Sequence, residues 1–140
     1  MPAPEGKLTP VQYEIMELIW HAPPPGTTVG ELYKALGPRR DVTRTTVQNL
    51  VERLEKRRWL VRKKGDGGYR YQAALEREPA TRALAEEFVD EFFSGSASDL
   101  VMSLLGSKRL KPEDLQRLRD QLDVRMSQQA GKSKTKPGGR

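Results

Sequence analysis

The feature that most constrains this chain is a helical apolar period that occurs in three short segments within its first 56 residues. In each segment apolar residues recur every three or four positions, which places them on one face of an α-helix. Each segment follows a threonine that can cap a helix N-terminus, at Thr9, Thr28 and Thr43. Gln12 and Glu31 complete capping boxes for the first two. Three short, separately capped helices are therefore expected.

The apolar positions also predict which side chains form the core. They are Val11, Ile15, Leu18 and Ile19 in the first helix, Val29, Leu32, Tyr33 and Leu36 in the second, and Val47, Leu50, Val51 and Leu54 in the third. The prolines at 23–25 are expected to end the first helix, and Gly37 with Pro38 the second.

After the third helix, two alternating segments flank the turn sequence GDGG at residues 65–68. This pattern predicts a β-hairpin over about residues 60–73. Trp59, Tyr69 and Tyr71 are expected to pack in its core, rather than to serve as stacking platforms for single-stranded nucleic acid. Three short helices followed by a hairpin is the element order of a winged helix-turn-helix domain. The predicted fold class is mainly α with a small β-hairpin.

Positive charge is concentrated in the same part of the chain. Residues 39–70 hold eleven lysines and arginines and four acidic residues, a local charge of +7, whereas the whole chain carries +6. Such a concentrated field attracts polyanions and speeds their association. Double-stranded DNA is therefore the expected partner.

The third helix, about residues 43–57, has a polar face opposite its apolar one. In helix-turn-helix proteins the second helix of the motif lies in the major groove, with its N-terminal residues at the base edges. Arginine suits guanine there, and glutamine or asparagine suits adenine. The predicted DNA-binding residues of this recognition helix are Arg44, Thr45, Thr46, Gln48, Asn49 and Arg53. Thr46 precedes the apolar Val47, so inward packing is its alternative.

Phosphate contacts are expected from the cations that surround this helix. In the hairpin, or wing, they are Arg62, Lys63, Lys64 and Arg70, and at the end of the helix they are Arg57 and Arg58.

The character of the chain changes after Glu76. Pro79 is expected to begin a helix, Ser98 to cap a short apolar one, and Pro112 to start the last. These helices carry more apolar surface than they can bury among themselves, which indicates dimerisation, with packing onto the first domain as the alternative. The predicted dimerisation residues are Leu84, Phe88, Phe92, Leu100, Leu104, Leu115, Leu118 and Leu122. The expected domains are 7–75 (winged helix), 76–126 (helical dimerisation region) and 127–140 (disordered basic tail).

Composition excludes several classes of function. The chain has no cysteine, hence no disulfide, thiolate metal site or cysteine nucleophile. Its one histidine, His21, has no serine or cysteine near it in sequence, so no catalytic residue, metal or other cofactor is predicted. No apolar run approaches the ~18 residues that span a bilayer, and the N-terminus has no signal-peptide core. A cytoplasmic protein without membrane association is expected.

Three stretches of this sequence resemble the penicillinase-repressor family, cytosolic regulators of β-lactamase and methicillin-resistance genes. LTPVQYEIMELIW at 8–20 is similar to the family's first helix, and residues 43–73 are similar to its recognition helix and wing. DLVMSLLG at 99–106 and LKPEDLQRLRDQL at 110–122 resemble its C-terminal dimerisation helices. The resemblance covers roughly residues 7–124.

This resemblance implies a homodimeric repressor that binds a palindromic operator and blocks transcription. In antibiotic-responsive members a membrane sensor-protease system triggers cleavage in the segment that matches 99–106, commonly between asparagine and phenylalanine. Ser103 and Leu104 occupy this candidate cleavage site here, and the difference favours a packing role for Leu104. A copper-responsive branch uses C-terminal cysteines, which this chain lacks. The family often has threonine where Asn49 stands, so the operator sequence is expected to differ.

Two other classes remain open at this point. One is a ligand-sensing winged-helix regulator with its effector between the domains. The other is a winged-helix module for protein interaction, in which Arg44, Gln48 and Asn49 would have no reason to cluster.

Overall fold

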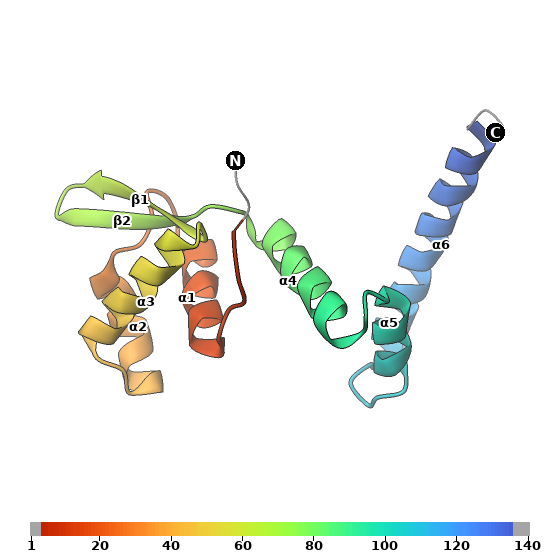
Figure 1. Cartoon of the computed structure of the whole chain (residues 1–140), viewed down its shortest axis with the longest axis horizontal. Helices are drawn as coiled ribbons and strands as arrows, with labels where there is room; N and C mark the ends of the chain where they lie inside the picture. Colours follow the sequence, from red (N-terminus) through yellow and green to blue (C-terminus); the bar gives the residue numbers. More distant parts are fainter. Residues whose placement is uncertain (1–3, 136–140) are drawn as a thin grey trace. The chain divides into compact units, whose positions relative to one another are not determined.

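The computed structural model describes residues 4–135, with side chains described as far as residue 131, and falls into two units (Figure 1). The first unit extends to Glu87 and the second begins at Phe88. Helix α4 (Arg77–Phe92) runs through this boundary, whereas the sequence placed the expected boundary after residue 75, before the helix begins.

The first unit has the predicted order of three helices and a hairpin. Its elements are α1 (Pro10–His21), α2 (Val29–Arg40), α3 (Arg44–Lys56), β1 (Leu60–Gly65) and β2 (Gly68–Ala73). The hydroxyls of Thr9, Thr28 and Thr43 each accept the backbone N–H three residues later, at 3.3, 3.1 and 3.1 Å. Gln12 and Glu31 accept the N–H of the capping threonine, both at 3.0 Å. Both predicted capping boxes are confirmed.

The core of this unit forms where the three helices meet the base of the hairpin. Its buried residues are Ile15, Met16, Ile19, Leu32, Leu36, Val47, Val51, Leu54, Trp59, Leu60, Tyr71 and Ala80. Seven of the predicted helix positions are in this set, and Val11, Leu18, Val29 and Leu50 are half-buried. Tyr33 is the exception: it is exposed, and its ring lies so close to Gly37 that a Cβ there would be 2.9 Å from it.

Helix α2 does not end at Gly37 and Pro38 as predicted. It continues to Arg40 and ends at Asp41, which has a left-handed φ of 53° and donates its N–H to Gly37 O at 2.8 Å. Pro38 lacks one backbone N–H donor, yet the helix continues through it, and the Asp41 N–H closes the last turn. The extra turn brings Arg39 and Arg40 to 2.8 and 2.7 Å from the carboxylate of Glu14 in α1.

The two strands of the hairpin are antiparallel, with residues 66–67 at the turn. Residues paired across the strands point to the same face, so Arg62 lies on the face of its partner Tyr71 and of Leu60. Leu60 and Tyr71 cover the core at the base of this face. Tyr69 lies nearer the tip, beyond the core, and is 47% exposed. The prediction that Tyr69 packs in the core is therefore wrong.

The first turn of α4 is held against α1. The indole N–H of Trp20 donates to Leu75 O at 2.9 Å, just before the helix begins. Arg77 lies 3.1 Å from the carboxylate of Glu17, which also accepts the hydroxyl of Tyr13. The Tyr13 hydrogen bond, with the charge of Arg77, lowers the pKa of Glu17 below its ordinary value. These bonds join the start of α4 to the winged-helix fold.

The second unit contains the end of α4, then α5 (Ala97–Leu105) and α6 (Pro112–Thr135). Pro112 opens α6, as predicted. The cap of α5 is Ser96 rather than Ser98, because the Ser96 hydroxyl accepts the N–H of Asp99 at 3.2 Å. Helix α4 begins at Arg77, two residues before the predicted Pro79, since proline is tolerated in a first turn.

Helix α6 is longer than expected. Residues 127–135, predicted to belong to a disordered tail, continue the helix because no proline interrupts the sequence before Pro137. The rest of the predicted tail, 136–140, lies outside the described residues. None of the helices within 4–135 is long and apolar enough to cross a membrane.

Candidate nucleic-acid interface

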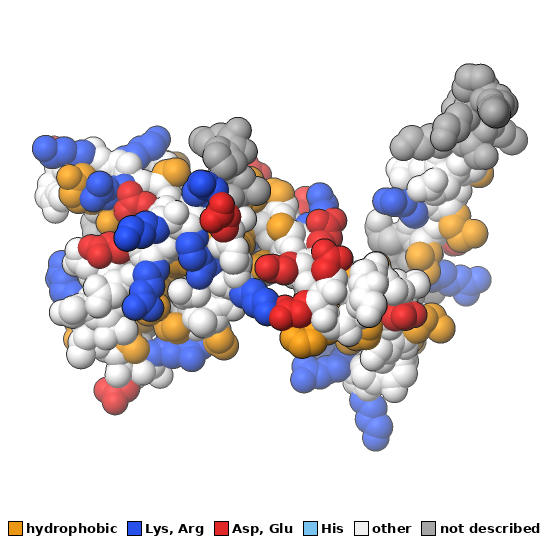
Figure 2. Space-filling model, viewed as in Figure 1, with side chains coloured by type: hydrophobic (Ala, Val, Ile, Leu, Met, Phe, Trp, Pro, Cys, Tyr) orange, Lys and Arg blue, Asp and Glu red, His pale blue; other side chains and the backbone are white. Residues whose placement is uncertain are grey.

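The candidate interface centres on the outer face of α3. Val47, Val51 and Leu54 are fully buried, which fixes the rotation of the helix about its axis. Arg44, Thr45, Gln48, Asn49 and Arg53 are all exposed. These α3 residues, which the sequence proposed for base and phosphate contact, are therefore accessible to a partner. In Figure 2 lysine and arginine side chains are spread over α3 and the hairpin, with acidic side chains among them.

Thr46 faces outward rather than into the core. Its side chain is exposed, and its hydroxyl lies 3.0 Å from that of Thr43. Its backbone N–H donates to the same Thr43 oxygen at 3.1 Å. Thr46 thus belongs to the N-terminal cap of α3, and the alternative of inward packing is excluded.

Arg44 lies across the first turn of α2. Its guanidinium lies within van der Waals distance of the position that a Cβ on Gly30 would take, at 3.5 Å. Both residues line an open hollow between α2, α3 and the tip of the hairpin, together with Gln48 and Tyr69. No ion pair ties Arg44 to any described residue, so its guanidinium is free for an outside acceptor.

The four wing cations fall into two pairs. Lys63 and Lys64 are exposed and have no acidic partner within the described residues. Arg62 is 3.4 Å from Glu55 of α3 and stacks over Tyr69, with its guanidinium carbon 4.3 Å from the ring centroid. Arg62 therefore braces the wing against α3.

The Arg70 side chain is bonded within the protein and is not free to bind a phosphate. It donates to Gly26 O at 2.9 Å and lies 3.6 Å from the Glu31 carboxylate. The loop before α2 is also joined to β2 through mutual backbone bonds between Thr27 and Tyr71. Arg70 thus fastens β2 to the start of α2.

Arg57 and Arg58, expected at phosphates, hold the N-terminal segment of the chain. Arg57 donates to the carbonyls of Glu5 and Lys7, and Arg58 lies 2.6 Å from the Glu5 carboxylate. The indole N–H of Trp59 also donates to Glu5 O, at 2.9 Å. Sequence could not show these bonds, because the partners lie about fifty positions apart.

The predicted dimerisation residues differ in their surroundings. Leu84 is partly buried against the core of the first unit, and Leu100 is half-buried. Phe88, Phe92, Leu104, Leu115, Leu118 and Leu122 are exposed. The rings of Phe88 and Phe92 lie 4.8 Å apart on one side of α4. Helix α5 has no buried residue, and both Ser103 and Leu104 are exposed on it.

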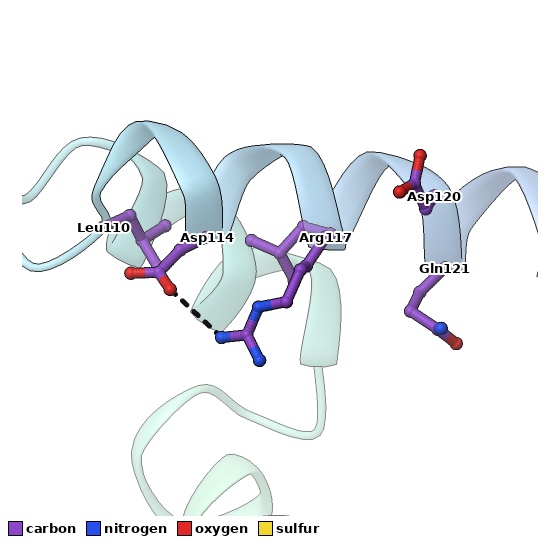
Figure 3. A pocket seen from close by; sticks show the side chains of 6 residues that line it. Leu110, Asp114, Arg117, Asp120 and Gln121 are labelled. Atoms are coloured by element: carbon purple, nitrogen blue, oxygen red, sulfur yellow. Dashed lines mark hydrogen bonds and ion pairs between the residues drawn. The ribbon is translucent and has the colours of Figure 1, made fainter.

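A surface hollow on α6 is lined by Leu110, Asp114, Arg117, Leu118, Asp120 and Gln121 (Figure 3). Asp114 accepts the N–H of Lys111 at 3.0 Å and the guanidinium of Arg117 at 3.0 Å. These two bonds hold the pKa of Asp114 below its ordinary value. Its carboxylate is thus engaged in capping the helix. No group of histidine and acidic side chains within the described residues could hold a metal ion.

The chain is similar in sequence to a known repressor and can be aligned with solved structures of a second protein. A penicillinase repressor of Staphylococcus aureus is 20% identical over 117 residues, which are 84% of this chain and 91% of that protein. Among solved structures, a point mutant of S. aureus MepR aligns with a TM-score of 0.47 and 18% identity, covering 86% of this chain and 79% of that one. A second MepR mutant, bound to an oligodeoxyribonucleotide, gives a TM-score of 0.46 with the same identity and coverage.

The profile of the penicillinase repressor family matches residues 8–124, most of the 140-residue chain. The match begins just before α1 and continues into α6, so it includes the winged helix and the C-terminal helices. The resemblance noted in the sequence is confirmed, and the chain belongs to the penicillinase repressor family.

Proposed function

We propose that this protein is a transcriptional repressor that binds operator DNA as a homodimer, without a cofactor or catalytic activity. The observation that carries the proposal is the outer face of α3. Gln48 and Asn49 are exposed on the side of α3 that faces away from the fully buried Val47, Val51 and Leu54, and Arg44 is exposed at the start of the same helix. A solvated structural helix needs only some polar side chains here, whereas a helix in a major groove uses the base-matching chemistry of each of these groups.

The chemistry of each side chain suggests its contact. Arg44 can donate two hydrogen bonds to guanine O6 and N7, and Gln48 or Asn49 can pair with adenine N6 and N7. Thr45 suits a phosphate or a thymine methyl group. These base contacts would supply discrimination of about 1–3 kcal/mol each.

The surrounding cations would hold the helix in register. Arg53, Lys63 and Lys64 are exposed and have no acidic partner among the described side chains, so their charges are available to phosphates. Arg62 and Arg70 would add to the positive electrostatic potential rather than bond directly to phosphates, because Arg62 already pairs with Glu55 and Arg70 with Gly26 O. The affinity should therefore fall steeply with salt.

The second unit supports the homodimer. Among its described residues, Val89 is the only apolar side chain that is buried, while aromatic and leucine side chains on α4, α5 and α6 are exposed. Covering these helices with a second copy would bury that surface. Two recognition helices would then meet half-sites about 10 bp, or a multiple of it, apart. Sedimentation of the full chain as a monomer at micromolar concentration, unchanged by operator DNA, would contradict this arrangement.

Induction by proteolysis would act on the second unit. The bond between Ser103 and Leu104 lies within α5, so a protease must first unwind this helix to reach it. We infer that Leu104 contributes to the dimer contact instead, since its side chain is among the exposed apolar groups of that unit.

A pair of substitutions tests base readout by α3. Gln48→Ala should weaken binding to the correct operator by about 1–3 kcal/mol and relax its specificity. Lys63→Ala, a matched change of an exposed wing residue, should weaken all duplexes to a similar extent and reduce the salt slope by about 1. If both variants lose affinity equally on random and operator duplexes, Gln48 does not contact a base.

A further inference from the structure

The outer face of α3 includes an acidic residue that the predicted contact set left out. Thr45, Gln48, Asn49 and Glu52 have the spacing i, i+3, i+4, i+7, the same spacing as the buried stripe from Val47 to Leu54. The two stripes are offset by two residues, a rotation of about 200° around the helix axis, so they lie on roughly opposite sides of α3. Glu52 is therefore near the middle of the exposed face, and about 10 Å along the axis from Thr45.

Glu52 differs from its acidic neighbours in having no cationic partner among the described side chains. Glu55 pairs with Arg62 at 3.4 Å, and Glu5 with Arg58 at 2.6 Å. Within the described residues, the bond that the Glu52 carboxylate accepts comes from the side-chain amide of Gln48, at 3.1 Å. An uncompensated negative charge thus lies on the surface that would approach a polyanion.

Such a charge is costly on most DNA. Phosphates repel it, and in the major groove the acceptor atoms of guanine and thymine offer it no hydrogen bond. A carboxylate has only acceptor oxygens, and the N4 amino group of cytosine is a donor that it fits, whereas the N6 amino group of adenine lies beside the acceptor N7, which repels a carboxylate. Repulsion from unsuitable sites, combined with one suitable contact, is an efficient way to gain specificity.

We propose that Glu52 is a specificity-determining residue of α3, which accepts a hydrogen bond from a cytosine N4 amino group in each operator half-site and repels duplexes that lack it. The inference rests on the proposed function and adds a base contact to it. Gln48 acts with Glu52, because donation of one amide N–H to the carboxylate orients the rest of the amide outward. The two side chains would then contact adjacent base pairs of the half-site together.

The test is selection from a random-sequence duplex pool by the full-length protein, followed by affinity measurements on the selected and random duplexes. The variant is Glu52→Gln, which keeps the shape and an acceptor oxygen for Gln48 but removes the charge. The matched control is Glu86→Gln, the same change of charge at an exposed position on α4. Thermal unfolding of each variant checks that the fold is retained.

The wild type and Glu86→Gln should select a consensus with cytosine at one fixed position in each half-site. Glu52→Gln should weaken that preference, because its neutral amide also offers donors to other bases, and should bind random duplexes more tightly, with a steeper salt dependence. Its ratio of selected to random affinity should fall about ten- to hundredfold, the discrimination expected of one good base contact.

Two results overturn the inference, and they differ from each other. If Glu52→Gln selects the same bases with an unchanged affinity ratio, Glu52 has no role in specificity, while the proposed repressor function stands. If the wild type selects no consensus at all, the proposed function fails, and the role of Glu52 fails with it.

Discussion

Replacing Leu54 with alanine tests whether the buried face of α3 holds its outer face in position. The Leu54 side chain is fully buried in the core of the first unit. Truncation removes three carbon atoms, each worth about 0.8 kcal/mol of transfer free energy. The cavity left behind adds to this, so the free energy of unfolding should fall by about 3 kcal/mol, within the range of about 2–5 kcal/mol for such changes. That loss is a large part of the stability of a small domain.

Urea unfolding monitored by tryptophan fluorescence measures this loss. The chain has two tryptophans, Trp20 and Trp59, and both lie in the first unit, so the signal reports its unfolding. With an m-value of about 1.5 kcal/mol per M, the midpoint should move by about 2 M. Gln48→Ala on the exposed face is the control and should change stability by less than about 0.5 kcal/mol. A loss below about 1 kcal/mol for Leu54→Ala would refute the orientation of α3, and with it the assignment of the DNA-facing side chains.

Further predictions concern the features that hold the winged-helix unit together. Thr43→Ala removes the cap of α3 and should cost about 0.5–2 kcal/mol in thermal unfolding, with no loss if the cap does not form. Gly26→Ala should destabilise by more than about 1 kcal/mol, because φ is +120° there and a Cβ would be 2.7 Å from Tyr71 O; an unchanged melting temperature would contradict this loop geometry. Since the pKa of Glu17 is lowered in the folded state, its contribution should be present above the ordinary value of 4.5 and be lost as the pH falls below it. Replacing Glu17 with glutamine should reduce the loss of stability at acid pH, and an unaltered acid dependence would contradict the bonds of Glu17 to Tyr13 and Arg77.

Local sequence signals predicted the winged-helix unit well, because its elements are specified by short-range chemistry. The threonine caps, the proline run and the GDGG turn each act within a few residues. The caps and the turn form as expected, and α1 ends before the prolines. The predicted end of α2 was wrong because Gly37 and Pro38 do not stop the helix, which is closed by the left-handed Asp41 instead. Tyr69 was misplaced because alternation gives the face of a strand but not how far the core extends along it.

The sequence predicted which residues belong to the candidate site, but not which of its cations already have a partner within the protein. Helical period alone placed Arg44, Gln48 and Asn49 on one exposed face. It could not distinguish free cations from engaged ones, since Arg70 binds a carbonyl 44 positions away. Nor could it show that Arg57 holds the N-terminal segment. Such contacts depend on the tertiary fold, which brings distant segments together.

The most direct test of the central claim is the affinity of the full chain for promoter DNA upstream of its own gene, against a scrambled duplex of equal length, across a series of salt concentrations. The account predicts a footprint within the promoter and a specificity ratio above about 10³ at physiological salt. Equal, steeply salt-dependent binding to the promoter, the scrambled duplex and a genomic fragment library would contradict it. The protein would then have a basic surface but no operator.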